Sequence, residues 1–298
     1  MIRVTARAKV NLRLAVLGRR TDGYHELETI MQSISLADEL SLEPAEHSEV
    51  SIGWAEGLAG PIPPQPDIVE RTVAAARLPG PERFRIVLKK RIPVGAGLGG
   101  ASADAAAALL GLERLQGTDP LAPLKTESLA GHLGADVPFC LTGGVALATG
   151  IGDRITPLDT GATLWWVIGI SQSALPTVGV YRRYDELVAA GAQVSSMVGS
   201  TADLISALAD GELEGVAANL ANDLEMAAFD LRPELGSLKQ RMVHAGALGS
   251  IMTGSGSAII GLCRDEGHAD QVAARAAEVF PRVEVAEGTP VGAEVVES

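Results

Sequence analysis

Cysteine and aromatic residues are scarce in this sequence. Of its 298 residues only two are cysteines, Cys140 and Cys263, and 3% are aromatic. Two thiols cannot form a disulfide framework, and no Cys-x-x-Cys pair is present, so a reducing compartment is expected. The five histidines have no metal-ligand spacing, and we therefore predict no metal site built by protein side chains alone. Because aromatic side chains are few, alanine, valine and leucine must fill the core.

Positive charge and long apolar runs are also in short supply. The 24 Lys and Arg residues face 37 Asp and Glu residues, and the net charge of −13 argues against a nucleic acid or an anionic membrane as partner. The longest apolar run, around residues 165–170, is far too short to cross a bilayer. The N-terminus carries Arg3, Arg7 and Lys9 and no uncharged apolar segment, so we expect no signal peptide and a cytoplasmic location.

Glycine, in contrast, is concentrated in the stretch 93–102, directly before an alanine-rich run. The stretch reads Pro93-Val94-Gly95-Ala96-Gly97-Leu98-Gly99-Gly100-Ala101-Ser102. Glycines let the backbone take positive φ and approach a ligand closely. We expect a helix over residues 102–116, capped by Ser102, whose free N–H groups point toward the same place. Loop and helix N-terminus together predict an anion site.

The stretch 93–102 can be compared with three known types of glycine-rich loop. A P-loop requires a lysine after its last glycine, and none follows here. Gly95-x-Gly97-x-x-Gly100 matches the dinucleotide fingerprint by letter, but the acidic residue at the right distance, Asp119, lies in a turn-like segment. The protein-kinase loop requires a valine where Ser102 stands. A flexible loop before a buried helix is the ordinary alternative, so this stretch leaves the function open.

Two polar positions elsewhere have ordinary explanations when taken alone. Apolar and polar residues alternate over residues 2–16, which predicts two strands broken near residues 6–8 and puts Lys9 and Asn11 on one face. Such a face is usually solvated. Asp136 is a single carboxylate in an apolar segment beside Pro138, where a turn or cap role is usual.

The composition changes near Pro157, and we place a domain boundary near residue 155. Beyond it, strands are expected at residues 164–170, 248–252, 258–263 and 283–286. Helices are expected around residues 179–190, 202–208, 213–220, 233–245 and 270–279. A small-residue turn at residues 253–257 joins two of these strands. This pattern predicts an α/β second half.

Three segments, in this order, resemble the motifs of the GHMP small-molecule kinases. They are Ala8-Lys9-Val10-Asn11-Leu12, the stretch 93–102, and Met252-Thr253-Gly254-Ser255-Gly256-Ser257. Together they span nearly the whole chain, and three ordered motifs are far more specific than one. The resemblance implies an α+β fold with two domains: residues 1–155 with a left-handed βαβ crossover, and residues 156–298 with a ferredoxin-like α/β arrangement. ATP and substrate would lie between them.

Within that family the sequence is most similar to the branch that phosphorylates CDP-methylerythritol in non-mevalonate isoprenoid biosynthesis. The most discriminating segment reads Gly18-Arg19-Arg20-x-Asp22-Gly23-Tyr24-His25. Residues 133–139 and 222–225 add further similarity. The resemblance implies ATP and Mg²⁺ as cofactors and the C2 hydroxyl group of the small-molecule substrate as acceptor.

The resemblance also assigns roles to individual residues. It implies that Lys9 and Asp136 are catalytic. Nucleotide-binding positions would be Lys90, Pro93, Val94, Gly95, Ala96, Gly97, Leu98, Gly99, Gly100, Ala101 and Ser102. Substrate-binding positions would be Asn11, Tyr24, His25, Thr177 and Tyr181, with the two tyrosines on either side of the cytosine.

Three residues depart from the family pattern. Ala96 and Ala101 replace common loop glycines. Asp67 stands where the family often has an asparagine, and a carboxylate cannot donate a hydrogen bond to adenine.

Other functions remain open at this point. They are another GHMP kinase with a different acceptor, a dinucleotide-binding oxidoreductase, and a non-catalytic ligand sensor on the same fold. The presence of both Lys9 and Asp136 argues against the sensor.

Overall fold

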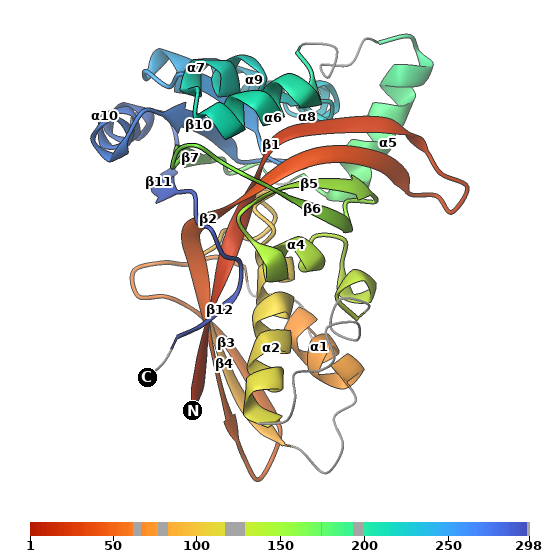
Figure 1. The fold of residues 1–298 in the computed structure, drawn as a ribbon, viewed down its shortest axis with the longest axis vertical. Coiled ribbons are helices and arrows are strands. Elements are labelled where there is room, and N and C mark those ends of the chain that lie inside the picture. The colour runs from red at the N-terminus through yellow and green to blue at the C-terminus, as the bar shows by residue number, and fades with distance from the viewer. Residues whose placement is uncertain (62–66, 77–82, 117–128, 174, 193–198, 297–298) are drawn as a thin grey trace.

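A long antiparallel hairpin runs through most of the molecule. The computed structural model describes residues 1–61, 67–76, 83–116, 129–173, 175–192 and 199–296. The hairpin consists of β1 (Ile2–Arg19) and β2 (His25–Pro44), drawn in red and orange in Figure 1. The expected break near residues 6–8 is instead a register shift between Arg7 and Lys9, and two more shifts follow. Such bulges twist and bend a strand without ending it, so one strand serves both halves.

In the described part of the chain the strands form two sheets. The first has the order β12-β1-β2-β4-β3, with β5 on β2, β6 on β5 and β8 on β1. Its further strands are β3 (Glu49–Trp54), β4 (Phe84–Lys90), β5 (Val145–Gly150), β6 (Arg154–Leu158), β8 (Ala221–Asn222) and β12 (Glu294–Val296). β3 and β4 are parallel neighbours joined through α1 (Ile68–Ala76), which is a βαβ crossover as expected.

The second sheet has the ferredoxin-like order. Its strands, in the spatial order β11-β7-β10-β9, are all antiparallel. They are β7 (Trp165–Ile170), β9 (Gly249–Met252), β10 (Ile259–Cys263) and β11 (Arg282–Glu287). The helices of this half are α5 (Thr177–Ala189), α6 (Thr201–Asp210), α7 (Leu213–Ala218), α8 (Glu225–Leu231), α9 (Pro233–His244) and α10 (Glu266–Ala276). The predicted α+β class is confirmed.

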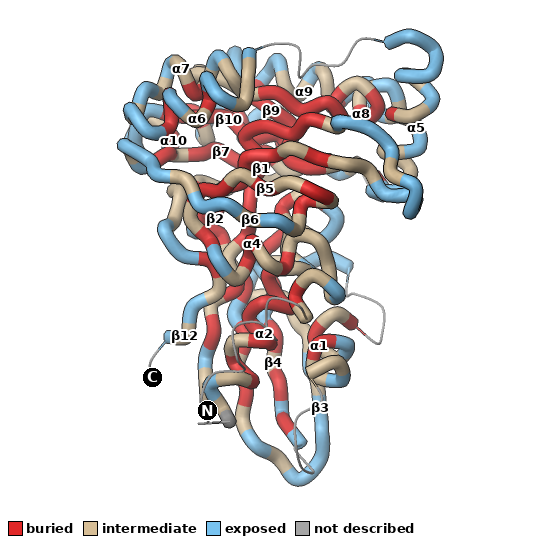
Figure 2. Tube along the Cα trace, turned by 45° about the vertical axis from the view of Figure 1, so that its right-hand side comes forward, coloured by how far each residue is buried: buried red, intermediate tan, exposed pale blue. Residues whose placement is uncertain are grey.

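The alanine-rich run lets a helix approach the first sheet closely. α2 (Gly100–Gln116) buries Ala105, Ala106, Ala107 and Ala108 completely. A Cβ atom on Gly111 would lie 2.5 Å from Leu42 Cδ1, so an alanine there would have to displace the Leu42 side chain. Figure 2 shows buried residues along α2 and along the middle of the hairpin beside it. Small residues therefore replace aromatic ones in this core, as the composition indicated.

The first sheet takes strands from both sides of residue 155, and the boundary at residue 155 stays a prediction. β6, which pairs with β5 in the first sheet, runs across that residue, and the second sheet begins with β7. Near the other end of the chain, β12 returns to the first sheet and pairs with residues 3–5 of β1. The first and the last described strands of the chain accordingly lie side by side (Figure 1).

Among the helices that the structure describes, none combines the length and the apolar character needed to cross a bilayer.

Candidate active site

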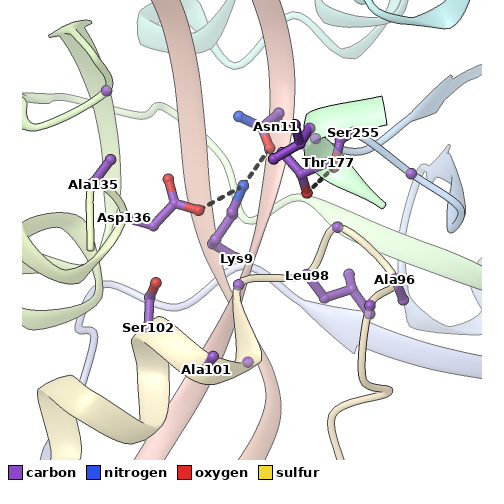
Figure 3. A pocket seen from close by; sticks show the side chains of 18 of the residues that line it. Lys9, Asn11, Ala96, Leu98, Ala101, Ser102, Ala135, Asp136, Thr177 and Ser255 are labelled. Carbon is purple, nitrogen blue, oxygen red and sulfur yellow. Dashed lines mark hydrogen bonds and ion pairs between the residues drawn. The ribbon is translucent and has the colours of Figure 1, made fainter. Parts of the chain in front are cut away.

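A cleft of about 1160 Å³ is lined by residues from both halves of the molecule. Its walls come from the β1–β2 hairpin, the glycine loop, the start of α4 (Val137–Thr142), α5, and the turn after β9. Every residue that the sequence predicts for the site lines this cleft: Lys9, Asn11, Tyr24, His25, Lys90, Pro93, Val94, Gly95, Ala96, Gly97, Leu98, Gly99, Gly100, Ala101, Ser102, Asp136, Thr177 and Tyr181. Figure 3 shows its central part.

The glycine loop is packed so tightly that side chains would not fit at two positions. Gly97 has φ +80°, and a Cβ atom there would lie 2.2 Å from the Thr253 carbonyl oxygen. A Cβ atom on Gly99 would lie 2.8 Å from Lys9 Cγ. The Leu98 carbonyl accepts a hydrogen bond from the Lys9 amide at 3.0 Å. The loop therefore carries no side chains at Gly97 and Gly99, because Thr253 packs against it on one side and Lys9 of β1 on the other.

The helix after the loop starts earlier than expected. α2 begins at Gly100, and the Ala103 amide donates to the Gly99 carbonyl oxygen at 2.9 Å. Ser102 therefore lies inside the first turn and is not the capping residue that we predicted. Ala101 is part of the same turn, where alanine is favourable. The Ser102 hydroxyl group points into the cleft on the side of Asp136 (Figure 3).

Lys9 and Asp136 meet in the cleft. Lys9 Nζ lies 3.3 Å from Asp136 Oδ2 and donates to Asn11 Oδ1 at 2.7 Å. Lys9 and Asn11 are buried, so the expectation of a solvated face is wrong. Asp136 occupies the N-cap position of α4, but its side chain makes no capping hydrogen bond. Its carboxylate, with a 33% exposed side chain, is directed instead toward Lys9 and the cleft.

A buried hydrogen-bond network holds Asn11 beside this pair. Asn11 Nδ2 donates to Thr29 Oγ1 at 2.8 Å, and the Thr29 hydroxyl donates to the Arg13 carbonyl oxygen at 2.6 Å. Thr253 Oγ1 accepts from the Asn11 amide at 2.9 Å. Thr29 and Thr253 were not predicted as site residues. Thr29 also lines the cleft, and the Thr253 hydroxyl group also lies 3.4 Å from the Gly97 carbonyl oxygen. The network fixes Asn11 Oδ1 as an acceptor for Lys9.

The other end of the cleft lies between the hairpin tip and α5. His25 stacks on Tyr181 with ring centroids 4.8 Å apart, and Tyr184 meets the His25 ring edge-on at 6.4 Å. Burial raises the pKa of the Tyr181 phenol. Tyr24 is 62% exposed at the hairpin tip. Thr177 forms a hydrogen bond of 2.9 Å with Ser255 (Figure 3).

Asp185 is a cleft residue that the sequence reading missed. Its Oδ1 lies 2.7 Å from His25 Nε2, and its Oδ2 lies 3.8 Å from Arg19 Nη1. Thr177, Tyr181 and Asp185 follow one another at four-residue spacing, which places them on one face of a helix. That four-residue spacing was the signal from which Asp185 could have been predicted as a site residue.

Lys90 is engaged by two buried carboxylates behind the loop. Its Nζ lies 2.5 Å from Asp38 Oδ2 and 2.5 Å from Asp104 Oδ2, and all three side chains are at most 2% exposed. Burial lowers the pKa of Lys90, but attraction by Asp104 and Asp38 raises it more, so the net change is upward. Burial raises the pKa of Asp104 well above its usual range. A direct contact of Lys90 with nucleotide stays a prediction.

Asp67 caps α1 through a pair of hydrogen bonds with Glu70. Asp67 Oδ1 accepts from the Glu70 amide at 2.8 Å, and Glu70 Oε2 accepts from the Asp67 amide at 2.9 Å. This reciprocal pair is a capping box. Burial raises the pKa of the Asp67 carboxyl.

Comparisons with known proteins agree on one family. The model "GHMP kinases N terminal domain" matches residues 67–144, and "GHMP kinases C terminal" matches residues 204–282. The chain is 41% identical to the 4-diphosphocytidyl-2-C-methyl-D-erythritol kinase of Nocardioides sp., with 98% of each chain covered. It is 42% identical to the enzyme of that name from Pelotomaculum thermopropionicum, with 92% of this chain and 93% of the relative covered.

Solved structures give the same result. A crystal structure of a 4-(cytidine 5'-diphospho)-2C-methyl-D-erythritol kinase is similar with a TM-score of 0.76 and 36% identity, covering 96% of this chain and 98% of that one. The mevalonate kinase of L. major, with a TM-score of 0.72 but 16% identity, covering 96% and 95%, shows the shared fold alone. The chain therefore belongs to the GHMP kinase family, in the branch of the 4-diphosphocytidyl-2-C-methyl-D-erythritol kinases.

Proposed function

We propose that this chain is a cytoplasmic kinase that transfers the γ-phosphoryl group of ATP to the C2 hydroxyl group of CDP-methylerythritol, a step of non-mevalonate isoprenoid biosynthesis. The observation that carries the proposal is the Lys9–Asp136 pair, 3.3 Å apart in the same cleft as a bare glycine loop. The names of the relatives supply the substrate. A phosphoryl-transfer site needs an anion cradle and a group that orients the acceptor, and we propose the glycine loop and Asp136 for these two roles.

The glycine loop and the start of α2 are proposed to hold the nucleotide phosphates. Loop residues 95–99 present main-chain groups to the cleft, and α2 adds the positive end of its dipole. This local field explains how a chain with a net charge of −13 can bind a polyanion. In-line positioning and charge neutralisation are the main requirements of the reaction.

Asp136 is proposed to orient the acceptor hydroxyl group and to accept its proton. Its carboxylate makes no capping bond, so it has free acceptor positions toward the cleft. Lys9 pairs with this carboxylate at 3.3 Å and supplies positive charge for the transferring group. Asn11 keeps the Lys9 ammonium group in place.

A magnesium ion fits the part of the cleft beside Ser102, where an oxygen donor is present. No group of three or more His, Cys, Asp or Glu side chains that could hold a metal ion occurs among the described residues. Mg²⁺ nevertheless takes most of its ligands from water and substrate phosphates and needs few from the protein. We infer that the Ser102 hydroxyl group, which points into the cleft, is the protein ligand. The bound ion would neutralise charge on the phosphate oxygens.

Formation of ADP in a coupled assay tests the proposed function. We expect turnover with ATP and CDP-methylerythritol, and a phosphate on C2 of the product by ³¹P NMR. Methylerythritol without the cytidyl group, mevalonate and homoserine serve as controls for the other acceptors of this family. ADP formation that does not depend on the cytidyl group would refute the proposed substrate. Binding of NADH in preference to ATP would refute a kinase.

Tyr24→Ala is expected to raise the KM for CDP-methylerythritol by about fivefold and to change kcat much less. A base–aromatic stack contributes roughly 1–3 kcal/mol, and Tyr24, at 62% exposure, belongs at the lower end. The stack exists in both the ground and the transition state, so its loss appears in KM. Steady-state kinetics measure both constants. Tyr24→Phe, which keeps the ring, is the control, and an unchanged KM in Tyr24→Ala would contradict the cytosine pocket.

A further inference from the structure

We propose that Asp185 is a positioning residue that makes the site selective for cytosine over uracil. It does so by fixing which ring nitrogen of His25 carries the proton. The inference rests on the proposed function, because it assumes that a pyrimidine nucleotide occupies the hairpin end of the cleft. It adds to that function the residue Asp185 and a physical reason why the site would select cytosine.

The contact between the two side chains determines the tautomer of His25. Asp185 Oδ1 lies 2.7 Å from His25 Nε2. An ionised carboxylate can only accept hydrogen bonds, so the proton of a neutral imidazole must lie on Nε2. His25 Nδ1 is then a hydrogen-bond acceptor. Nδ1 has no hydrogen-bond partner within the residues that the structure describes, which leaves it available to a ligand.

The His25 ring has little freedom to turn away from this arrangement. Its side chain is 10% exposed. Tyr181 stacks on one face at 4.8 Å with an interplanar angle of 29°, and Tyr184 packs edge-on at 6.4 Å and 88°. Arg19 Nη1 lies 3.8 Å from the second Asp185 oxygen. The ring is therefore held by α5 and by the hairpin together, and Asp185 supplies its polar anchor.

An acceptor at this point distinguishes the two pyrimidines by their 4-substituents. Cytosine carries an amino group there and donates a hydrogen bond, whereas uracil carries a carbonyl oxygen and only accepts. The ribose and diphosphate are the same in both nucleotides, so both bases are presented in the same register. His25 Nδ1 would pair with the cytosine amino group and would face a second acceptor in uracil. A well-formed pair of this kind discriminates roughly 10- to 100-fold.

The experiment compares CDP and UDP binding by calorimetry, together with kcat/KM for CDP- and UDP-methylerythritol. We expect the wild type to prefer the cytidine compounds roughly 10- to 100-fold. Asp185→Ala releases the Nε2 proton, so Nδ1 can carry it and donate to uracil, and the preference should fall to about threefold or less. Asp185→Asn retains an oxygen that accepts from Nε2 and should keep most of the preference.

Asp230→Ala is the matched control. Asp230 is a carboxylate on α8 that pairs with Arg183 of α5 at 2.6 Å, so its removal also loosens a contact of α5. Its side chain does not line the cleft. We expect the wild-type base preference in this variant. A merely structural role of Asp185 would lower affinity for both nucleotides equally and leave their ratio unchanged, and that result would overturn the inference.

Two outcomes separate this inference from the proposed function. A wild-type protein that phosphorylates neither substrate refutes the proposed function. An active wild type whose Asp185→Ala variant keeps the full base preference refutes the inference alone. If Asp185→Ala does not fold, ¹⁵N NMR of the wild-type imidazole decides, with His25→Gln to assign the signal. The Nε2–H tautomer is expected, and an Nδ1–H tautomer would overturn the inference.

Discussion

Asp136→Asn is expected to lower kcat by roughly 10²–10⁴ while ATP still binds. An amide cannot accept the proton of the acceptor hydroxyl group, although it has nearly the same size as the carboxylate. The change also removes the negative charge 3.3 Å from Lys9 Nζ, so the ammonium group loses the partner that helps to orient it. ATP affinity should stay near the wild-type value, because we propose that main-chain groups of the glycine loop, and not Asp136, hold the phosphates.

Single-turnover kinetics and ATP calorimetry together test this expectation. Asp159→Asn is the matched control, since Asp159 is exposed and does not line the cleft. It removes the same charge from the protein and should leave kcat unchanged. A kcat for Asp136→Asn within threefold of the wild type would end the assignment of Asp136 as the base.

Lys90→Met is expected to destabilise the fold by about 3–5 kcal/mol. The variant leaves Asp38 and Asp104 buried without their counter-ion, and both are at most 2% exposed. Asp38 Oδ1 also accepts from the Ile92 amide at 2.8 Å, at the entry to the glycine loop. The loop should therefore lose its geometry before the protein unfolds, and the KM for ATP should rise.

Urea denaturation measures the free energy of unfolding, and Lys89→Met is the matched control. Lys89 is the exposed neighbour on the same strand, and the same substitution there should change stability by no more than about 0.5 kcal/mol. The deficit of Lys90→Met should shrink as the pH falls. Burial raises the pKa of Asp104 and Lys90 lowers it, so the loss of Lys90 leaves that pKa higher in the folded variant than in the folded wild type. A higher folded-state pKa means that the variant gains more stability toward acid than the wild type does. Equal losses for both variants would contradict the buried ion cluster.

Local patterns predicted the elements that have strong periodicity. The alternation over residues 2–16 indicated β-structure, and the alanine run indicated α2. Periodicity cannot show that bulges join two expected strands into β1, because a bulge depends on the partner strand. The strand β8 and the helix α8 are too short to leave a periodic signal. The start of α2 was misplaced because Ser102 is a good cap in isolation.

The site was predicted from motifs, and its geometry could not be read from local sequence. Lys9 looks like a surface residue on its strand, since its partner Asp136 is far away in the sequence and is brought to it by the fold. The dinucleotide alternative fails because the loop follows β4, whose neighbours β2 and β3 belong to a GHMP sheet and not to a doubly wound one. The roles of Lys9 and Asp136 stay predictions until the variants are measured.

The pairing of β12 with β1 has a consequence for how the protein is made. In the described part of the chain, the edge of β1 opposite β2 pairs with β8 at residues 13–14 and with β12 at residues 3–5, and β12 is synthesised last. A ribosome adds about 5–20 residues per second. The nascent hairpin is complete at residue 44 and β12 ends at residue 296, so the hairpin waits about 13–50 s for its last neighbour. An unpaired edge is a template for wrong association during that interval. A chaperone that shields strand edges on the ribosome should therefore raise the yield of this protein.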